Sequence, residues 1–464
     1  MLKKAKTVLS LCMVAAMFFL TACGSSSDKS GNASATTTTE NSQNENQDVT
    51  NETNTTESAE KTVITFQTWN PDEPAFQPVE KDFESKFPQY DVQLVYIPYS
   101  DHISKLKVDL ASGEGPDTFG LQTGATMKEF KEFLADLAPL SKDEWGDNWL
   151  DKFIPFTTEL IKGNLDSYYG LPLGSTYAGI LWADTYYFNK YGYEIPTNLD
   201  ELKDVAQKFR QNGEYPLAIG AKDDWINIDM FMNIANDINP EKLYSAIDGN
   251  TPWTDDDLVQ ALTIWGELFT SGVFQDGALG VNMYNDTTDL FDREGSIPMI
   301  CNGSWTINNY LKTDEQIAAL WDDANSGHGH VPFAIDWNND GKAAAVTAAV
   351  DVVIVENKQS ANSEAAWDFI SYMATDGADI LVNDLLYYLP AKAGVKFEGT
   401  LSEAGMNAFN KISEIASNVA GYREIPYPEL KQSICDNLKA IATGSVTPQQ
   451  AAEAIEAVSK TTER

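Results

Sequence analysis

Three stretches decide the fold of this chain: VITFQTWN at residues 63–70, VQLVYI at 92–97 and GPDTF at 115–119. Their β-branched and aromatic residues predict three buried strands. Two segments between them repeat apolar residues at helical spacing, namely Val79, Phe83 and Phe87, then Ile103, Leu106 and Leu110. This strand–helix–strand–helix–strand order predicts a parallel sheet with right-handed crossovers. Such sheets bind ligands at the carboxyl ends of their strands, which makes Trp69 and the residues after Phe119 candidate contacts.

A second α/β pattern begins beyond Leu171. Apolar stripes predict two further helices, one with Leu199, Leu202, Val205 and Phe209, the other with Leu258, Leu262, Trp265 and Phe269. Residues 333–355 are expected to form a hairpin that turns at 338–341. The same turn matches the start of a calcium-binding loop, but Thr347 stands where such a loop needs a bidentate Glu, which favours the hairpin.

The N-terminus has the pattern of an export signal. Lysines at positions 3, 4 and 6 precede an uncharged, largely apolar run, residues 8–20, which is too short to span a bilayer comfortably. The sequence Leu20-Thr21-Ala22-Cys23-Gly24 resembles the lipobox of bacterial lipoproteins. We therefore predict a signal peptide over residues 1–22 and a lipid on Cys23. An ordinary secretory signal with an incidental cysteine is the alternative.

Residues 23–61 are expected to form a disordered tether. They are rich in Ser, Thr, Asn and Glu and contain almost no large apolar side chain, so they cannot bury enough surface to offset ordering. Together with Cys23, this tether predicts a chain that is lipid-anchored at the extracytoplasmic face of the cell membrane. About 400 residues remain beyond it, which suggests two lobes.

The net charge of −37 argues against two classes of partner. A strongly acidic surface repels nucleic acid phosphates and anionic lipid head groups, so we expect no nucleic acid and no membrane contact beyond the lipid. Beyond Cys23 the only cysteines are Cys301 and Cys435; buried free thiols are favoured, and a disulfide stays open. No cluster with metal-ligand spacing accompanies His328 and His330, and no cofactor or metal is expected.

Five segments, in order, resemble the extracellular solute-binding proteins of ABC importers, in the group that includes maltose- and oligosaccharide-binding proteins. They are the strand ending at Trp69, the segment 105–117 (KL…ASGEGPD), the segment 169–182 (YGLPL…LW), the segment 297–305 (IPM…NGSW), and AAWDF at 365–369 followed by LPA at 389–391. The chain departs from the family pattern at residues 183–185 and 297–298, which puts the particular ligand in doubt more than the class.

The resemblance implies two α/β lobes, a hinge and a ligand cleft between the lobes, as in periplasmic binding proteins. Residues 62–176 and 350–385 would form the first lobe, and residues 177–349 and 386–464 the second lobe with hinge-associated C-terminal helices. The chain would cross between the lobes near Tyr177 and Ala349. The implied ligand is a carbohydrate, and the implied partner an ABC permease.

A sugar site needs aromatic rings for the apolar faces of the sugar and polar groups for its hydroxyls. The family pattern places candidate ligand contacts at six positions: Trp69, Gln122, Tyr177, Trp305, Tyr387 and Tyr388. Trp225 is a further candidate, expected to line the second lobe. Trp253 is a weaker candidate in the second lobe. For the tryptophans the alternative is a place in the core. No catalytic residue is predicted.

Two rival functions stay open at this point. A surface glycoside hydrolase would need a matched pair of carboxylates, and no motif singles one out. A binding protein for a phosphorylated solute would need Arg or Lys near the cleft, and the candidate segments contain few of either. Polyols and peptides are further possible solutes.

Overall fold

The computed structural model describes residues 61–464, apart from the side chain of Ser100. The predicted signal peptide, the predicted lipid site at Cys23 and nearly all of the predicted tether lie outside the described residues. Within that range no helix combines the length and apolar character that a bilayer crossing requires.

Five strands form the first sheet, in the order β2-β1-β3-β10-β4. Their bounds are β1 Thr62–Thr68, β2 Tyr90–Tyr96, β3 Thr118–Leu121, β4 Leu171–Pro172 and β10 Val353–Glu356. Strand β1 is parallel to both β2 and β3, with Ile64 opposite Val92 and Phe66 opposite Thr118. The predicted parallel sheet is therefore confirmed. Two antiparallel strands from later in the chain, β10 and β4, complete it.

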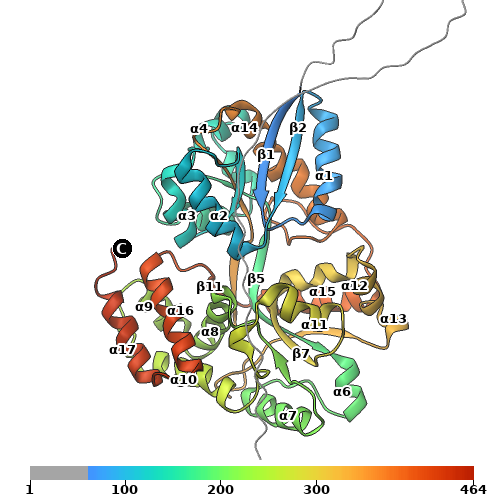
Figure 1. Ribbon diagram of the computed structural model, residues 1–464, viewed down its shortest axis with the longest axis vertical. Coiled ribbons are helices and arrows are strands. Elements are labelled where there is room, and N and C mark those ends of the chain that lie inside the picture. The colour runs from blue at the N-terminus through green and yellow to red at the C-terminus, as the bar shows by residue number, and fades with distance from the viewer. Residues whose placement is uncertain (1–60) are drawn as a thin grey trace, which may run out of the picture. The chain divides into compact units, whose positions relative to one another are not determined.

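The helices that pack on this sheet are α1 Glu73–Lys86, α2 Tyr99–Ser112, α3 Ala125–Phe130, α4 Ala138–Trp145, α5 Pro155–Lys162 and α14 Ser363–Tyr372 (Figure 1). Asp72 caps α1, where its carboxylate accepts the backbone N–H of Ala75. The predicted stripe of α1 is buried at Val79 and Phe83, and the Phe83 ring lies 5.2 Å from that of Phe369 on α14.

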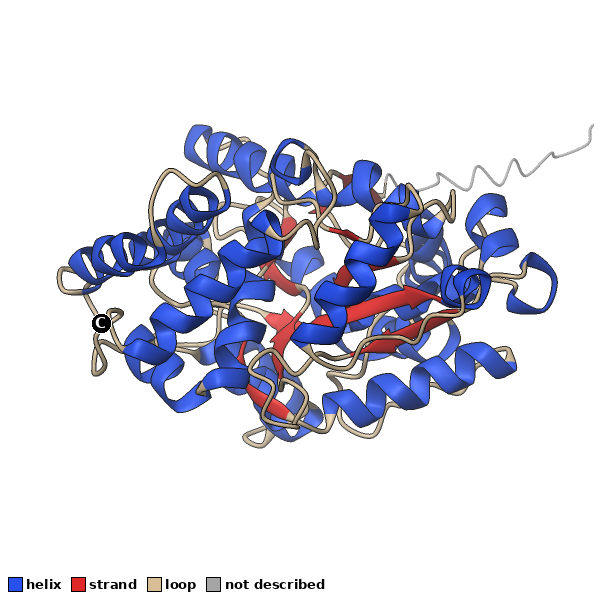
Figure 2. Cartoon of the chain, turned by 90° about the horizontal axis from the view of Figure 1, so that it is seen from below, coloured by secondary structure: helices blue, strands red, loops and turns tan. Residues whose placement is uncertain are grey.

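The second sheet has the order β11-β9-β5-β7-β6, with β8 paired to β5. Its strands are β5 Ser175–Asp184, β6 Leu217–Ala218, β7 Met299–Gly303, β8 His330–Phe333, β9 Val346–Val350 and β11 Val419–Tyr422. The helices around it are α6 Thr185–Tyr191, α7 Leu199–Gln211, α8 Asp224–Ile238, α9 Pro240–Ile247, α10 Asp256–Thr270, α11 Thr288–Asp292, α12 Glu315–Leu320, α13 Asp323–Ser326, α15 Glu403–Ala416, α16 Pro428–Ala442 and α17 Pro448–Ser459. Figure 2 shows the strands in the interior of the molecule with helices around them.

The hairpin predicted over residues 333–355 is wrong. Strands β8 and β9 do not pair with each other; both pair with β5, β9 along its first half and β8 along its second. The residues between them leave the sheet and return. Within this excursion the carboxylate of Asp336 accepts the backbone N–H groups of Asp340 (3.1 Å) and Gly341 (2.7 Å).

Neighbouring strands connect the two sheets. The chain leaves β4 of the first sheet for β5 of the second, and returns from β9 to β10. Strands β5 and β9 lie side by side, with Ser175 opposite Val350. A third segment joins them, since Ser175 and Leu389 exchange backbone hydrogen bonds of 2.8 and 3.2 Å. The residue boundaries of the two lobes stay a prediction.

Both stripes predicted for the second part of the chain lie on helices, α7 and α10, and face the larger core. Cys301 and Cys435 are buried and unpaired, so the two-thiol interpretation is confirmed and no disulfide joins them. Burial raises the pKa of both thiols.

Candidate functional site

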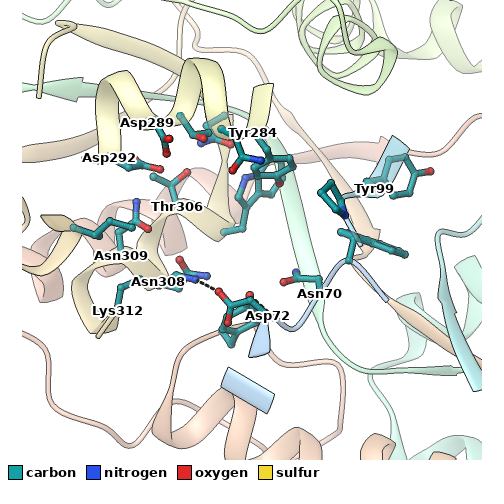
Figure 3. Close-up of a pocket in the computed structure, with 18 of the residues that line it drawn as sticks. Asn70, Asp72, Tyr99, Tyr284, Asp289, Asp292, Thr306, Asn308, Asn309 and Lys312 are labelled. Atoms are coloured by element: carbon teal, nitrogen blue, oxygen red, sulfur yellow. Dashed lines mark hydrogen bonds and ion pairs between the residues drawn. The ribbon is translucent and has the colours of Figure 1, made fainter. Parts of the chain in front are cut away.

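A cavity of about 220 Å³ lies where the first strands end, and residues from both sheets line it. From the first sheet come the segments that follow β1 and β2, including Trp69 and Tyr99. From the second come the segment before and within α11 and the 3₁₀ helix Ser304–Leu311 that follows β7. Figure 3 shows side chains of these segments pointing toward one another. The position after the carboxyl ends of parallel strands is where such folds bind ligands.

Aromatic rings form one side of the cavity and of a smaller hollow beside it. Trp225 lies 6.0 Å from Trp305, edge to face, and stacks on Tyr284 at 5.6 Å. Across from them the Trp69 ring meets Tyr99 edge to face at 4.9 Å. Both hollows share Trp69, Tyr99, Tyr284 and Trp305. Rings from both lobes are thus available to a ligand between them.

Gly303 allows Trp305 to fold back over its own strand end. A methyl group added to Gly303 would lie 2.1 Å from the Trp305 ring. Only a residue without a side chain tolerates this approach. The glycine of the GSW motif therefore leaves the space in which the tryptophan ring lies.

A buried ion pair supports these rings from behind. Arg423 follows β11, is 4% exposed, and donates to both carboxylate oxygens of Asp229 on α8 at 2.7 Å each. Its guanidinium carbon lies 5.1 Å from the Trp305 ring centre and 5.8 Å from that of Trp225. Burial disfavours the charge of Arg423, but the Asp229 carboxylate holds the pKa of the arginine above its ordinary value. Such cation–π contacts fix ring positions.

The opposite side of the larger cavity is polar. Asp289, Asp292, Thr306, Asn308, Asn309 and Lys312 gather there, and Figure 3 shows them on one side, with Tyr99 on the other. Burial raises the pKa of Asp292 to about 7, although the nearby Asn309 and Lys312 favour its ionised form.

One ion pair joins the two sides of the cleft. The Nζ of Lys312, from the second lobe, lies 2.7 Å from Oδ2 of Asp72, from the first. Lys312 also lies 4.9 Å from the Tyr387 ring centre, and the Tyr387 hydroxyl accepts the backbone N–H of Asp72 at 3.0 Å. Asn70 donates to Asp351 at 2.6 Å, beside the chain's return to the first sheet. These contacts hold the segment after β1 against the second lobe.

The predicted site residues are mostly brought together. Trp69, Trp305 and Tyr387 line the larger cavity, and Gln122 and Trp225 line the adjoining hollow with Trp69 and Trp305. Tyr388 lies behind Tyr387, is buried against Gly174, and lines a narrow recess with Trp305.

Two of the candidates lie apart from these hollows. Tyr177 lines neither of them, and its backbone N–H donates to the Ser304 hydroxyl. Trp253 belongs to the fully buried core, so the suggestion that it lines the second lobe's site is wrong.

Sequence patterns found Gln122 but missed the other polar residues of the site. Asn70 and Asp72 follow Trp69 directly and could have been found as neighbours of a strand end. Arg423 has no such signal, because it reaches the site only through the pairing of β11 with β9 and through Asp229 on α8. In residues 61–464, no group of three or more His, Cys, Asp or Glu side chains is placed to hold a metal ion.

The chain belongs to the bacterial extracellular solute-binding protein family, whose model matches residues 69–380. An ABC transporter extracellular-binding protein of Pyrococcus horikoshii is 24% identical over 325 residues, which cover 68% of each chain. The maltotriose-binding protein of Pyrococcus abyssi is 27% identical over 323 residues, 68% of this chain and 62% of its own. A solved structure from work on xylan utilization by Caldanaerobius polysaccharolyticus has a TM-score of 0.72 at 18% identity, covering 85% of this chain and 99% of its own. This last similarity shows the fold.

Proposed function

We propose that this protein captures a carbohydrate, an oligosaccharide, in the cleft and delivers it to an ABC permease while a lipid on Cys23 tethers it to the membrane. One observation carries the proposal. The cleft combines the indole rings of Trp69, Trp225 and Trp305 with a row of amide, hydroxyl and carboxylate groups, and each cation lining its two hollows is already paired.

The paired cations argue against an anionic ligand. Lys312 is bound to Asp72, Arg293 to Asp289 and Asp314, and Arg423 to Asp229. A phosphate group would need an Arg or Lys that is free to turn toward it. Sugars need none, because their C–H faces stack on rings and their hydroxyls exchange hydrogen bonds with polar side chains.

The cleft has room for more than one sugar unit. Tyr99 and Trp225, which line the hollow beside Trp305, also line a wider hollow of about 540 Å³. This hollow runs along α16, where Lys431 and Gln432 contribute polar groups, and Lys107 and Lys222 also line it. Two hollows that share lining residues favour an oligosaccharide over a monosaccharide. One relative is named a maltotriose-binding protein, and one similar structure comes from work on xylan utilization. Both names favour an oligosaccharide as the ligand.

Calorimetry tests the carbohydrate assignment. Purified protein should bind at least one of maltotriose, xylotriose and chitotriose, and mass spectrometry should detect a glycan that copurifies with it. Absence of binding to every sugar tested, together with binding of a peptide or polyol, would overturn the carbohydrate assignment. Release of reducing sugar from any of these probes would instead favour a glycoside hydrolase.

The anchor is tested separately. Metabolic labelling with a fatty acid should mark the wild-type protein and leave Cys23→Ala unlabelled. The variant should also fail to sediment with membranes. Equal labelling of both proteins would contradict the lipid on Cys23.

A further inference from the structure

His102 on α2 is a buried histidine that lines none of the hollows described above. It is 0% exposed and lies beside Trp69, with the two ring centres 5.3 Å apart. Its Nε2 lies 2.8 Å from the backbone carbonyl oxygen of Gly120 on β3, and its Nδ1 lies 3.2 Å from Nε2 of Gln67 on β1. The imidazole thus bridges two strands of the first sheet at the end where Trp69 leaves it.

The partners of His102 define which form of the ring is present. A carbonyl oxygen can only accept a hydrogen bond, so Nε2 of His102 carries a hydrogen and donates it to Gly120. The neutral ring leaves Nδ1 as an acceptor, which the side-chain amide of Gln67 satisfies as donor. A protonated ring would place a second donor against that amide. Burial lowers the pKa of His102 to about 4, although the hydrogen bond to Gly120 acts in the opposite direction, so the ring is neutral at neutral pH.

The residues around this imidazole also hold the Trp69 ring. Tyr99 and His102 are three positions apart on α2, so they lie on one face of the helix. Tyr99 meets the Trp69 ring edge to face at 4.9 Å, next to the contact from His102. A methyl group added to Gly120 would lie only 3.3 Å from the Trp69 ring. The tryptophan therefore lies close to the residue whose carbonyl His102 binds.

Trp69 needs this support because part of its ring faces the cleft. It is partly buried and lines both the larger cavity and the hollow beside it. A ring with neighbours on one side only keeps its rotamer if those neighbours hold it. A ring that moves freely must be ordered when a ligand binds, at a cost in affinity. The contacts from α2 and β3 therefore affect ligand binding without touching a ligand.

We propose that His102 is a positioning residue, whose imidazole, held between Gln67 and Gly120, keeps the Trp69 ring in the orientation in which it meets a ligand. The assignment rests on the proposed function, because Trp69 is a candidate ligand contact. It goes beyond that function by naming a buried residue behind the site. His102 acts through Trp69 alone.

Calorimetry with the trisaccharide that wild-type protein binds best, chosen among maltotriose, xylotriose and chitotriose, measures the effect on binding. His102→Leu removes the ring and both hydrogen bonds, and binding should weaken about threefold to tenfold, the cost of ordering one side chain on binding. His102→Gln retains a donor for Gly120 and an acceptor for Gln67, so it should recover most of the affinity. The control is Val79→Ala, which destabilises a buried position of α1 outside the site and should bind like wild type.

Near-ultraviolet circular dichroism reports the ring itself and needs no sugar. An aromatic side chain in fixed packing gives a signal that is lost when the packing loosens. The difference between wild type and Trp69→Phe isolates the contribution of Trp69. The same difference measured in the His102→Leu background should be smaller, and in the Val79→Ala background it should keep its wild-type size.

A second variant covers the case in which His102→Leu does not fold. Gln67→Met removes the donor to Nδ1 and leaves the imidazole in place, and it should lower both the affinity and the dichroism difference. Thermal melting without sugar shows which variants are folded at the temperature of measurement.

Wild-type affinity, or an unchanged dichroism difference, in the folded variant would overturn the role of His102. So would an equal loss of affinity in Val79→Ala. An affinity of His102→Gln as low as that of His102→Leu would overturn the hydrogen bonds as the means of positioning. Absence of binding of every sugar by the wild type would overturn the proposed function instead, and the dichroism difference would still decide whether His102 fixes the Trp69 ring.

Discussion

On one side of the cleft Arg423 is bound by both oxygens of Asp229 and lies against the rings of Trp225 and Trp305. On the other side Asp292, Thr306 and Asn309 belong to a polar wall, where Asn309 favours the ionised form of Asp292. The first side is held together by an ion pair within the protein. On the second side Asp292 has no ion pair among the described residues. Mutations on the first side should therefore reduce stability, and mutations on the second should reduce affinity.

The largest effect is expected at the first side. Arg423→Met leaves Asp229 buried without its cation, which should lower the free energy of unfolding by about 3–5 kcal/mol. Urea denaturation followed by tryptophan fluorescence measures this. Lys203→Met, which breaks a partly exposed pair with Glu267, is the control and should cost under about 1 kcal/mol. A stability loss at Arg423 no greater than at Lys203 would show that the ion pair does not support the cleft.

Trp305 lies between the two sides, and its truncation should produce the largest loss of affinity. Trp305→Ala removes the ring against which a sugar would stack, and binding should weaken about 30-fold or more. Calorimetry with the preferred neutral trisaccharide measures it. Tyr215→Ala, at an exposed tyrosine, is the control. Unchanged affinity in Trp305→Ala would remove this residue from the site.

The ion pair between the lobes should contribute less. Lys312→Met breaks the bridge to Asp72, and ligand affinity should fall roughly twofold to fivefold, because partly exposed pairs contribute under about 1 kcal/mol. The loss should shrink at high salt. Lys342→Met, at a lysine whose side chain is 84% exposed, should have no effect. Equal affinities of Lys312→Met and wild type at low salt would mean that this pair does not favour the closed cleft.

The smallest effect concerns the pH dependence of stability at the second side. The pKa of Asp292 is about 7 in the folded protein, above its ordinary value of 3.8, because of burial. The folded state thus holds this proton more tightly than the unfolded state, and the stability contributed is present below pH 4 and lost as the pH rises through 7. Asp292→Asn should therefore raise the melting temperature at pH 8, by roughly 1–3 °C, and raise it less at pH 4.5.

Melting curves at the two pH values decide this prediction. A gain that is the same at both pH values would mean that the carboxyl group titrates normally. Because Asp292 also lines the cavity, a higher melting temperature with a lower affinity would mark Asp292 as a residue kept for its ligand.

Local patterns predicted much of the scaffold because they report periodicity and strand composition. The strands at 63–66 and 92–97, the stripe at Val79 and Phe83, and the position of Trp69 after a strand follow from neighbours in sequence. Trp305 was found through the resemblance of its segment to the family's GSW motif. The hairpin prediction at 333–355 was wrong because β8 and β9 each pair with β5 and not with each other. The local sequence of residues 333–355 carries no information about this pairing with β5. The prediction that Trp253 lines the site was wrong for a similar reason. Whether a tryptophan lies in the core or in a cleft depends on which residues pack against it.

The sequence by itself indicated the class of fold, the family and three candidate cleft tryptophans, Trp69, Trp225 and Trp305, since each depends on short segments of the chain. Tertiary structure alone decided the rest of the site. Arg423 and Asp229 are 194 positions apart, and Lys312 and Asp72 are 240 apart. Which carboxylates are paired follows from charges brought together by two sheets, and no local pattern encodes that distance.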